Sequence, residues 1–138
     1  MPMVALPGGR SYASRMKTGK VIIQSNSLIQ DHELKVGHIL AQTGHDVIFL
    51  PVTAGKSPDI KYRGKIWEIK SPKGSKRRTI ENNIRNALKQ SQNVIIDLSR
   101  TQRADSVCIR DVQTQIEHRP ALRSVIVIDK AGRIIVLK

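Results

Sequence analysis

The most basic segment of the chain contains two isolated carboxylates. Residues 57–78 read SPDIKYRGKIWEIKSPKGSKRR, in which Asp59 and Glu68 stand among many lysines and arginines. Glu68 and Lys70 are two residues apart, so on a strand both side chains point to the same face. Two neighbouring carboxylates repel one another unless a cation compensates their charge. The pattern predicts that Asp59, Glu68 and the Ile69 carbonyl hold a hard divalent cation, with Lys70 beside it.

A further carboxylate lies upstream, in a predicted helix. Glu33 shares its helical spacing with residues that form an apolar stripe: Val36, Gly37, Leu40 and Ala41. A carboxylate on such a face is costly unless it is paired or binds a metal. We therefore expect Glu33 to be a ligand of the same cation, directly or through water, and Gly37 to allow a close approach. The alternative is a solvated acid near a helix start, stabilised by the helix dipole.

These groups together suit the hydrolysis of a phosphodiester. A divalent metal lowers the pKa of a bound water and so generates the nucleophile. Lys70 is expected to stabilise the charge that develops in the transition state, or to position the attacking water. Oxygen ligands favour Mg2+, with Mn2+ and Zn2+ as alternatives.

The charge of the chain points to a polyanionic substrate. The 138 residues carry a net charge of +13, and such a field attracts nucleic acid through counterion release. The basic loop after Lys70 and the helix that follows it are expected to contact phosphates, while a solvated charged loop is the alternative. The predicted substrate-binding residues are Ser71, Lys73, Lys76, Arg77, Arg78, Asn83 and Arg85.

Other classes of site and partner are disfavoured. Cys108 is the only cysteine, so no disulfide forms within the chain. The four histidines show no zinc spacing with cysteine, and His32 is interpreted as a surface residue rather than a proton shuttle. We find no apolar run long enough to cross a membrane and no signal peptide, and expect no membrane partner.

Hydrophobic patterning predicts a single α/β domain, with a central mixed β-sheet flanked by helices. Residues 1–18, broken by Pro2, Pro7 and two glycines, are expected to form a flexible arm, and residues 19–138 the domain. Helices are predicted from Asn26 or Ser27 to about Gln42, over 79–92, and over 103–118. Strands are predicted at 20–24, 46–51 and 93–98, with one hairpin around Gly64 and another over 124–138.

The spacing of the acidic residues and the lysine resembles the PD-(D/E)xK nucleases, which share the restriction-endonuclease-like fold. Pro58-Asp59 and Glu68-Ile69-Lys70 follow that motif literally. Longer stretches, over residues 32–51, 57–72 and 79–99, are similar to the C-terminal nuclease domains of CdiA-type contact-dependent growth inhibition toxins. The likeness extends over about residues 28–99.

This resemblance implies specific roles and partners. Asp59 and Glu68 would be metal ligands, Lys70 the catalytic lysine, and Glu33 the supporting acid. Toxins of this type cleave tRNA in the cytoplasm of a neighbouring cell after delivery, and a cognate immunity protein blocks them. A DNA endonuclease with the same four residues is the first alternative. A non-catalytic nucleic-acid-binding module or a phage structural protein is the second.

Overall fold

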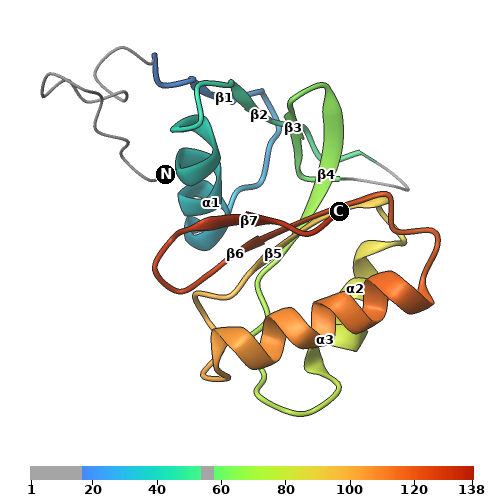
Figure 1. The fold of residues 1–138 in the computed structure, drawn as a ribbon. Helices are drawn as coiled ribbons and strands as arrows, with labels where there is room; N and C mark the ends of the chain where they lie inside the picture. Colours follow the sequence, from blue (N-terminus) through green and yellow to red (C-terminus); the bar gives the residue numbers. More distant parts are fainter. Residues whose placement is uncertain (1–16, 54–57) are drawn as a thin grey trace, which may run out of the picture.

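The computed structural model describes residues 17–53 and 58–138 of the chain (Figure 1). A seven-stranded mixed sheet has its strands in the order of the sequence, and three helices pack on it. The strands are β1 (Val21–Ile23), β2 (Val47–Phe49), β3 (Ile60–Tyr62), β4 (Lys65–Lys70), β5 (Asn93–Asp97), β6 (Ser124–Ile128) and β7 (Ile134–Val136). The helices are α1 (Asp31–Ala41), α2 (Thr79–Ala87) and α3 (Asp105–His118).

The directions of the strands bring several carboxyl ends to one edge of the sheet. β1 runs parallel to β2, β3 is antiparallel to both of its neighbours, and β4, β5 and β6 run parallel. β7 returns antiparallel to β6. Each parallel pair is joined through a helix, as a parallel connection requires. Lys70, Asp97 and Ile128 therefore end neighbouring strands on the same side of the molecule.

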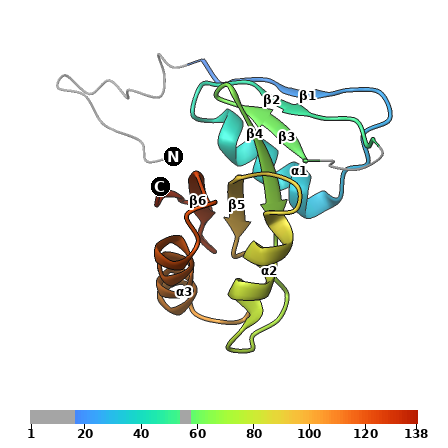
Figure 2. The same ribbon diagram turned by 90° about the vertical axis from the view of Figure 1, so that its right-hand side faces the viewer.

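The two faces of the sheet are covered by different helices (Figure 2). The alternation of side chains along β5 assigns Ile95 to the face that packs with α1, and Val94 and Ile96 to the face that packs with α2 and α3. Such continuous apolar runs are typical of strands buried on both sides. The expected α/β domain with a mixed sheet and flanking helices is confirmed. The more specific restriction-endonuclease-like core stays a prediction.

Helix α1 approaches β2 closely at a glycine. A Cβ atom on Gly37 would lie 2.7 Å from Cε2 of Phe49, a residue that is only 2% exposed. A larger residue would have to displace a packed aromatic ring, which core packing resists. The close approach expected at Gly37 therefore exists, and its partner is Phe49.

The hairpin predicted around Gly64 is confirmed. Arg63 and Gly64 both have positive φ angles, 52° and 76°, as the two central residues of a type I′ turn do. This two-residue turn fixes the register of β3 against β4, with Tyr62 opposite Lys65 and Ile60 opposite Trp67.

Two predicted helix boundaries are wrong. Helix α1 begins at Asp31, not after Asn26 or Ser27. Asn26 adopts a left-handed backbone conformation with φ of 66°, and the Ser27 hydroxyl donates to the carbonyl of Phe49. These residues are therefore tied to the end of β2 and cannot cap the helix.

Helix α2 ends at Ala87 rather than near Gln92. The amides of Lys89, Gln90 and Ser91 make short-range turn bonds to Asn86 and Ala87, and Ser91 Oγ donates to the carbonyl of Ile66. The chain leaves the helix to meet β4 before entering β5. Most of the predicted N-terminal arm, residues 1–16, lies outside the described residues.

Candidate active site

The turn at Arg63-Gly64 places Asp59 directly beside Glu68. The pairing of Ile60 with Trp67 continues one residue further, since the Asp59 amide donates to the Trp67 carbonyl at 3.0 Å. The Asp59 side chain closes this end of the hairpin, because its Oδ2 accepts the Ile69 amide at 2.7 Å. Asp59 therefore lies opposite Glu68 on the two arms of one hairpin.

Glu68 and Lys70 share one face of β4, as predicted. Lys70 Nζ lies 3.5 Å from Glu68 Oε2. Glu68 is only 6% exposed, and its second oxygen, Oε1, is buried without a hydrogen-bond partner in the described part of the chain. A buried carboxylate oxygen without a partner is costly, and it marks a position where a further ligand would be favourable.

The carboxyl groups of Asp59 and Glu68 both have raised pKa values. Burial, followed by the negative charge of Glu68, raises the pKa of Asp59 from 3.8 to about 8. Burial also raises the pKa of Glu68, against the opposing effects of Asp59 and Lys70. Two buried carboxylates that repel one another in this way are typical of functional sites.

Glu33 affects Asp59 and Glu68 through its charge, and it also caps the start of α1. Its charge contributes to the raised pKa of both Asp59 and Glu68, so α1 begins close to the hairpin. Its Oε1 accepts the backbone amide of Gln30 at 2.9 Å, within a capping box at the helix start. The side chain is half-buried and the fully buried stripe begins at Val36, so Glu33 lies at the margin of that stripe.

The ligand set suits a hard cation held by two carboxylates. Within residues 17–53 and 58–138, no three His, Cys, Asp or Glu side chains lie close enough together to hold a metal ion. Asp59 and Glu68 nevertheless lie opposite each other. Asp59 Oδ1 and Glu68 Oε1 take no part in the contacts with the Ile69 amide and Lys70. The unpartnered Glu68 Oε1 and the all-oxygen donors fit Mg2+. Glu33 fits a role through water better than direct ligation.

The predicted substrate-binding residues divide into two groups. Lys73, Lys76, Arg77, Arg78 and Arg85 are exposed on the loop before α2 and on α2 itself, and Arg78 pairs with Glu81. The donors of Ser71 and Asn83 are engaged within the protein: Ser71 Oγ donates to Asp97 at 2.8 Å and Asn83 Nδ2 to the Thr79 carbonyl at 2.8 Å. Contact of these residues with substrate stays a prediction.

Asp97 is a residue that the sequence analysis missed. It ends β5 next to Ser71 and is only 3% exposed. Its oxygens accept bonds from Ser71 Oγ and from the amide and hydroxyl of Ser99. The available signal was a carboxylate closing an otherwise apolar strand, since ligands in α/β proteins gather at the carboxyl ends of strands.

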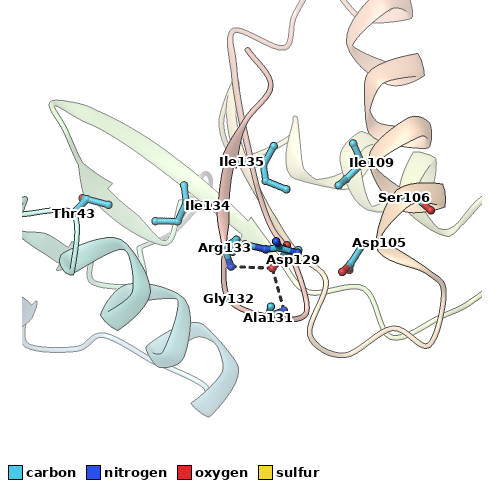
Figure 3. Close-up of a pocket in the computed structure, with 10 residues that line it drawn as sticks. All are labelled: Thr43, Asp105, Ser106, Ile109, Asp129, Ala131, Gly132, Arg133, Ile134 and Ile135. Atoms are coloured by element: carbon cyan, nitrogen blue, oxygen red, sulfur yellow. Dashed lines mark hydrogen bonds and ion pairs between the residues drawn. The ribbon is translucent and has the colours of Figure 1, made fainter. Parts of the chain in front are cut away.

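Asp59, Glu68 and Lys70 together are called the carboxylate centre below. A cavity of about 780 Å³ lies away from this centre (Figure 3). It is lined mainly by the start of α3, the β6–β7 turn and β7. Figure 3 shows Asp129 held by hydrogen bonds from Ala131 and Arg133 rather than turned to an open centre. The cavity contains none of the four predicted catalytic residues, and we assign it no role in the chemistry.

None of the helices in the described ranges is long and apolar enough to cross a membrane.

Comparisons with known proteins agree with one another. Residues 56–134 match the family described as the contact-dependent growth inhibition CdiA C-terminal domain. A curated relative, tRNA nuclease CdiA-2 of Burkholderia pseudomallei strain 1026b, is 30% identical over 121 residues, which cover 84% of this chain and 4% of the relative. This chain thus spans a small part of that protein's length.

A solved structure supports the same likeness. The CdiA-CT/CdiI toxin and immunity complex from Burkholderia pseudomallei contains a chain that is 25% identical, with a TM-score of 0.66. The match covers 87% of this chain and 99% of that one.

Proposed function

The chain belongs to the contact-dependent growth inhibition CdiA C-terminal domain family, and on that premise we propose that it is a tRNA-cleaving nuclease. The membership confirms the likeness to CdiA-type toxin domains. The relative named as a tRNA nuclease supports RNA over DNA as the substrate. The net charge of +13 suits either nucleic acid.

One observation carries the proposal: Asp59, Glu68 and Lys70 lie together on one hairpin, with Glu33 within electrostatic reach. A merely basic binding module has no use for buried carboxylates, because they repel phosphate. A metal-dependent phosphodiesterase of the PD-(D/E)xK type does use them. We therefore favour hydrolysis over simple binding.

In the proposed mechanism, Asp59 and Glu68 hold a divalent cation, most suitably Mg2+, with Glu33 acting through water. When bound, the cation supplies Lewis-acid stabilisation and a lowered pKa for water. The hairpin keeps both carboxylates in place without the cation, because the Ile69 amide fixes Asp59 and the strand fixes Glu68.

Lys70 is proposed to stabilise the negative charge that develops on the phosphate during hydrolysis. Its side chain is 28% exposed and points toward Glu68 from the end of β4, where a phosphate can approach from solvent. An ammonium group in this position stabilises the additional negative charge on the phosphoryl oxygens as water attacks. It also offsets part of the charge of Glu68 before substrate binds.

The domain is proposed to act in the cytoplasm of a target cell after delivery, and to be neutralised there by a cognate immunity protein. The relative solved as a toxin and immunity complex supports such a partner. A strongly basic surface would favour rapid association with an acidic protein.

The proposal is tested by incubating the chain with total tRNA and with plasmid DNA, each with Mg2+ or with EDTA. We expect cleavage of tRNA that needs Mg2+ and falls by about 10²-fold or more in Glu68→Gln. Lys61→Gln, an exposed change on β3, is the matched control and should retain activity. Undiminished cleavage in EDTA would refute the metal-dependent mechanism, and cleavage of plasmid alone would refute the choice of tRNA.

A further inference from the structure

A second, smaller cavity opens beside the carboxylate centre. It measures about 220 Å³ and lies between the start of α1 and the chain that follows β5 and β6. His32 and Lys35 line it from the helix, and Asp97, Ser99 and Lys130 line it from the strand ends. This edge of the sheet carries the carboxyl ends of parallel strands, where α/β proteins bind their ligands.

Residues of the cavity adjoin those of the carboxylate centre on two segments of the chain. His32 directly precedes Glu33 in α1. On the other side, Ser71 directly follows Lys70 and donates to Asp97 at 2.8 Å. A polynucleotide bound at the carboxylate centre would therefore extend past this cavity.

The carboxylates of the cavity are already satisfied by the surrounding chain. Asp97 accepts bonds from Ser71 and Ser99, and Asp129 accepts bonds from Ala131 and Arg133. Lys130 is likewise engaged, by Asp105. The other basic side chains at or beside the cavity form no ion pair with a carboxylate among the described residues.

Those side chains are His32 and Lys35, which line the cavity, and Arg100, which is not among its lining residues but contacts His32. Arg100 Nη1 lies 3.3 Å from His32 Nε2, and Lys35 is exposed one turn along the same helix. Among the described residues, none of the three forms an ion pair with a carboxylate. Because arginine has no acceptor, Arg100 Nη1 donates to His32 Nε2, and this bond orients the guanidinium. The other N–H groups of Arg100 and the Lys35 ammonium can then donate to one anion, and the fork of arginine matches a phosphate.

We propose that His32, Lys35 and Arg100 bind a backbone phosphate of the nucleic acid that neighbours the phosphodiester at the carboxylate centre. This inference rests on the proposed nuclease function and adds a subsite to it. A phosphate contact positions the strand without reading the bases. The subsite should therefore contribute equally to the binding of different tRNA sequences.

The test measures binding without cleavage. The Glu68→Gln protein serves as the background, and its affinity for labelled total tRNA is measured over a range of salt concentrations. Adding Arg100→Gln should weaken binding by about tenfold and make the slope of log K against log salt shallower by about 0.7 to 1. Lys35→Gln should change the slope in the same direction.

Arg123→Gln provides a control that removes the same charge. Arg123 is exposed and precedes β6, at the end of that strand opposite to the cavity. Its removal should alter affinity and slope far less than Arg100→Gln. Because Arg100 is half-buried, thermal unfolding of each variant is measured as well. If Arg100→Gln unfolds at the assay temperature, the exposed Lys35→Gln decides the question against Arg123→Gln.

Failure of the phosphate subsite can be distinguished from failure of the nuclease proposal. If the wild type cleaves tRNA but Arg100→Gln and Lys35→Gln bind as Arg123→Gln does, the subsite is refuted and the nuclease stands. If the two variants lose affinity and slope while the wild type cuts nothing, the phosphate site stands and the nuclease proposal is wrong. Absence of tRNA binding in the Glu68→Gln background would refute the subsite.

Discussion

Asp59 holds its proton because the fold buries it beside the charge of Glu68. Burial is the largest cause, the charge of Glu68 the next, and the Ile69 amide opposes them by favouring the ionised form. A carboxylate in this state is poorly suited to remain charged alone and well suited to bind a cation that replaces its proton. The affinity of this site for a cation therefore depends on the packing around Asp59 as much as on the carboxylate itself.

This proton makes stability depend on pH. Between 3.8, the ordinary pKa, and about 8, the folded protein keeps a proton on Asp59 that the unfolded chain has released. The free energy of unfolding should therefore fall as the pH rises through this range. We expect the thermal midpoint in EDTA to drop between pH 5 and pH 8 by about 3 °C or more beyond the drop in Asp59→Asn. Parallel pH profiles for the two proteins would contradict the assignment.

The proximity of Asp59, Glu68 and Lys70 could be predicted from the sequence, but their surroundings could not. The two-residue spacing of Glu68 and Lys70 is enough to place both on one face of a strand, and the glycine turn brings Asp59 back to them. The bond from Ser71 to Asp97 depends on the pairing of β4 with β5, which no local pattern specifies. The contact of Arg100 with His32 joins residues 68 positions apart, and for the same reason the interpretation of His32 as a plain surface residue missed its place at a cavity.

At the scale of the element, helix α1 positions Glu33 at its start and packs its buried face against β2. Its capping box ties Glu33 to the amide of Gln30, and its buried face fits against Phe49 through Gly37. The apolar spacing along α1 predicted this face correctly. The start of the helix was misplaced because Asn26 and Ser27 are good capping residues by type, while tertiary bonds to β2 hold them outside the helix.

Two substitutions separate the capping role of Glu33 from its charge. Glu33→Gln keeps an acceptor for the Gln30 amide, since glutamine also serves in a capping box, and should change stability by less than about 0.5 kcal/mol. Glu33→Ala removes the acceptor and should cost about 1 kcal/mol. If Glu33 supports the cation, both variants should lose tRNA cleavage to a similar extent.

Urea unfolding and cleavage assays on the same preparations check this prediction. An exposed position on the same helix, altered as His38→Ala, controls for general effects on α1. Full cleavage by Glu33→Gln would show that the carboxylate has only a structural role.

At the scale of the whole molecule, folding and cation binding should be coupled. A ligand that binds only the folded state stabilises it, by about 2.7 kcal/mol when its concentration is 100 times its dissociation constant. We expect Mg2+ to raise the thermal midpoint of the wild type by several degrees at pH 8 and to have little effect on Asp59→Asn or Glu68→Gln. Equal shifts in all three proteins would indicate that Mg2+ acts elsewhere on the chain.

The sheet has a further property that follows from its strand order. Each strand from β2 to β7 pairs with the strand that precedes it in the chain, so one of its partners always lies upstream. The hairpins β3–β4 and β6–β7 close short loops at little entropic cost. The parallel pairs β1–β2, β4–β5 and β5–β6 join residues at least 26 positions apart and are expected to form more slowly. A polypeptide that emerges end first from a narrow pore could therefore build this sheet strand by strand, without waiting for its last residues to arrive.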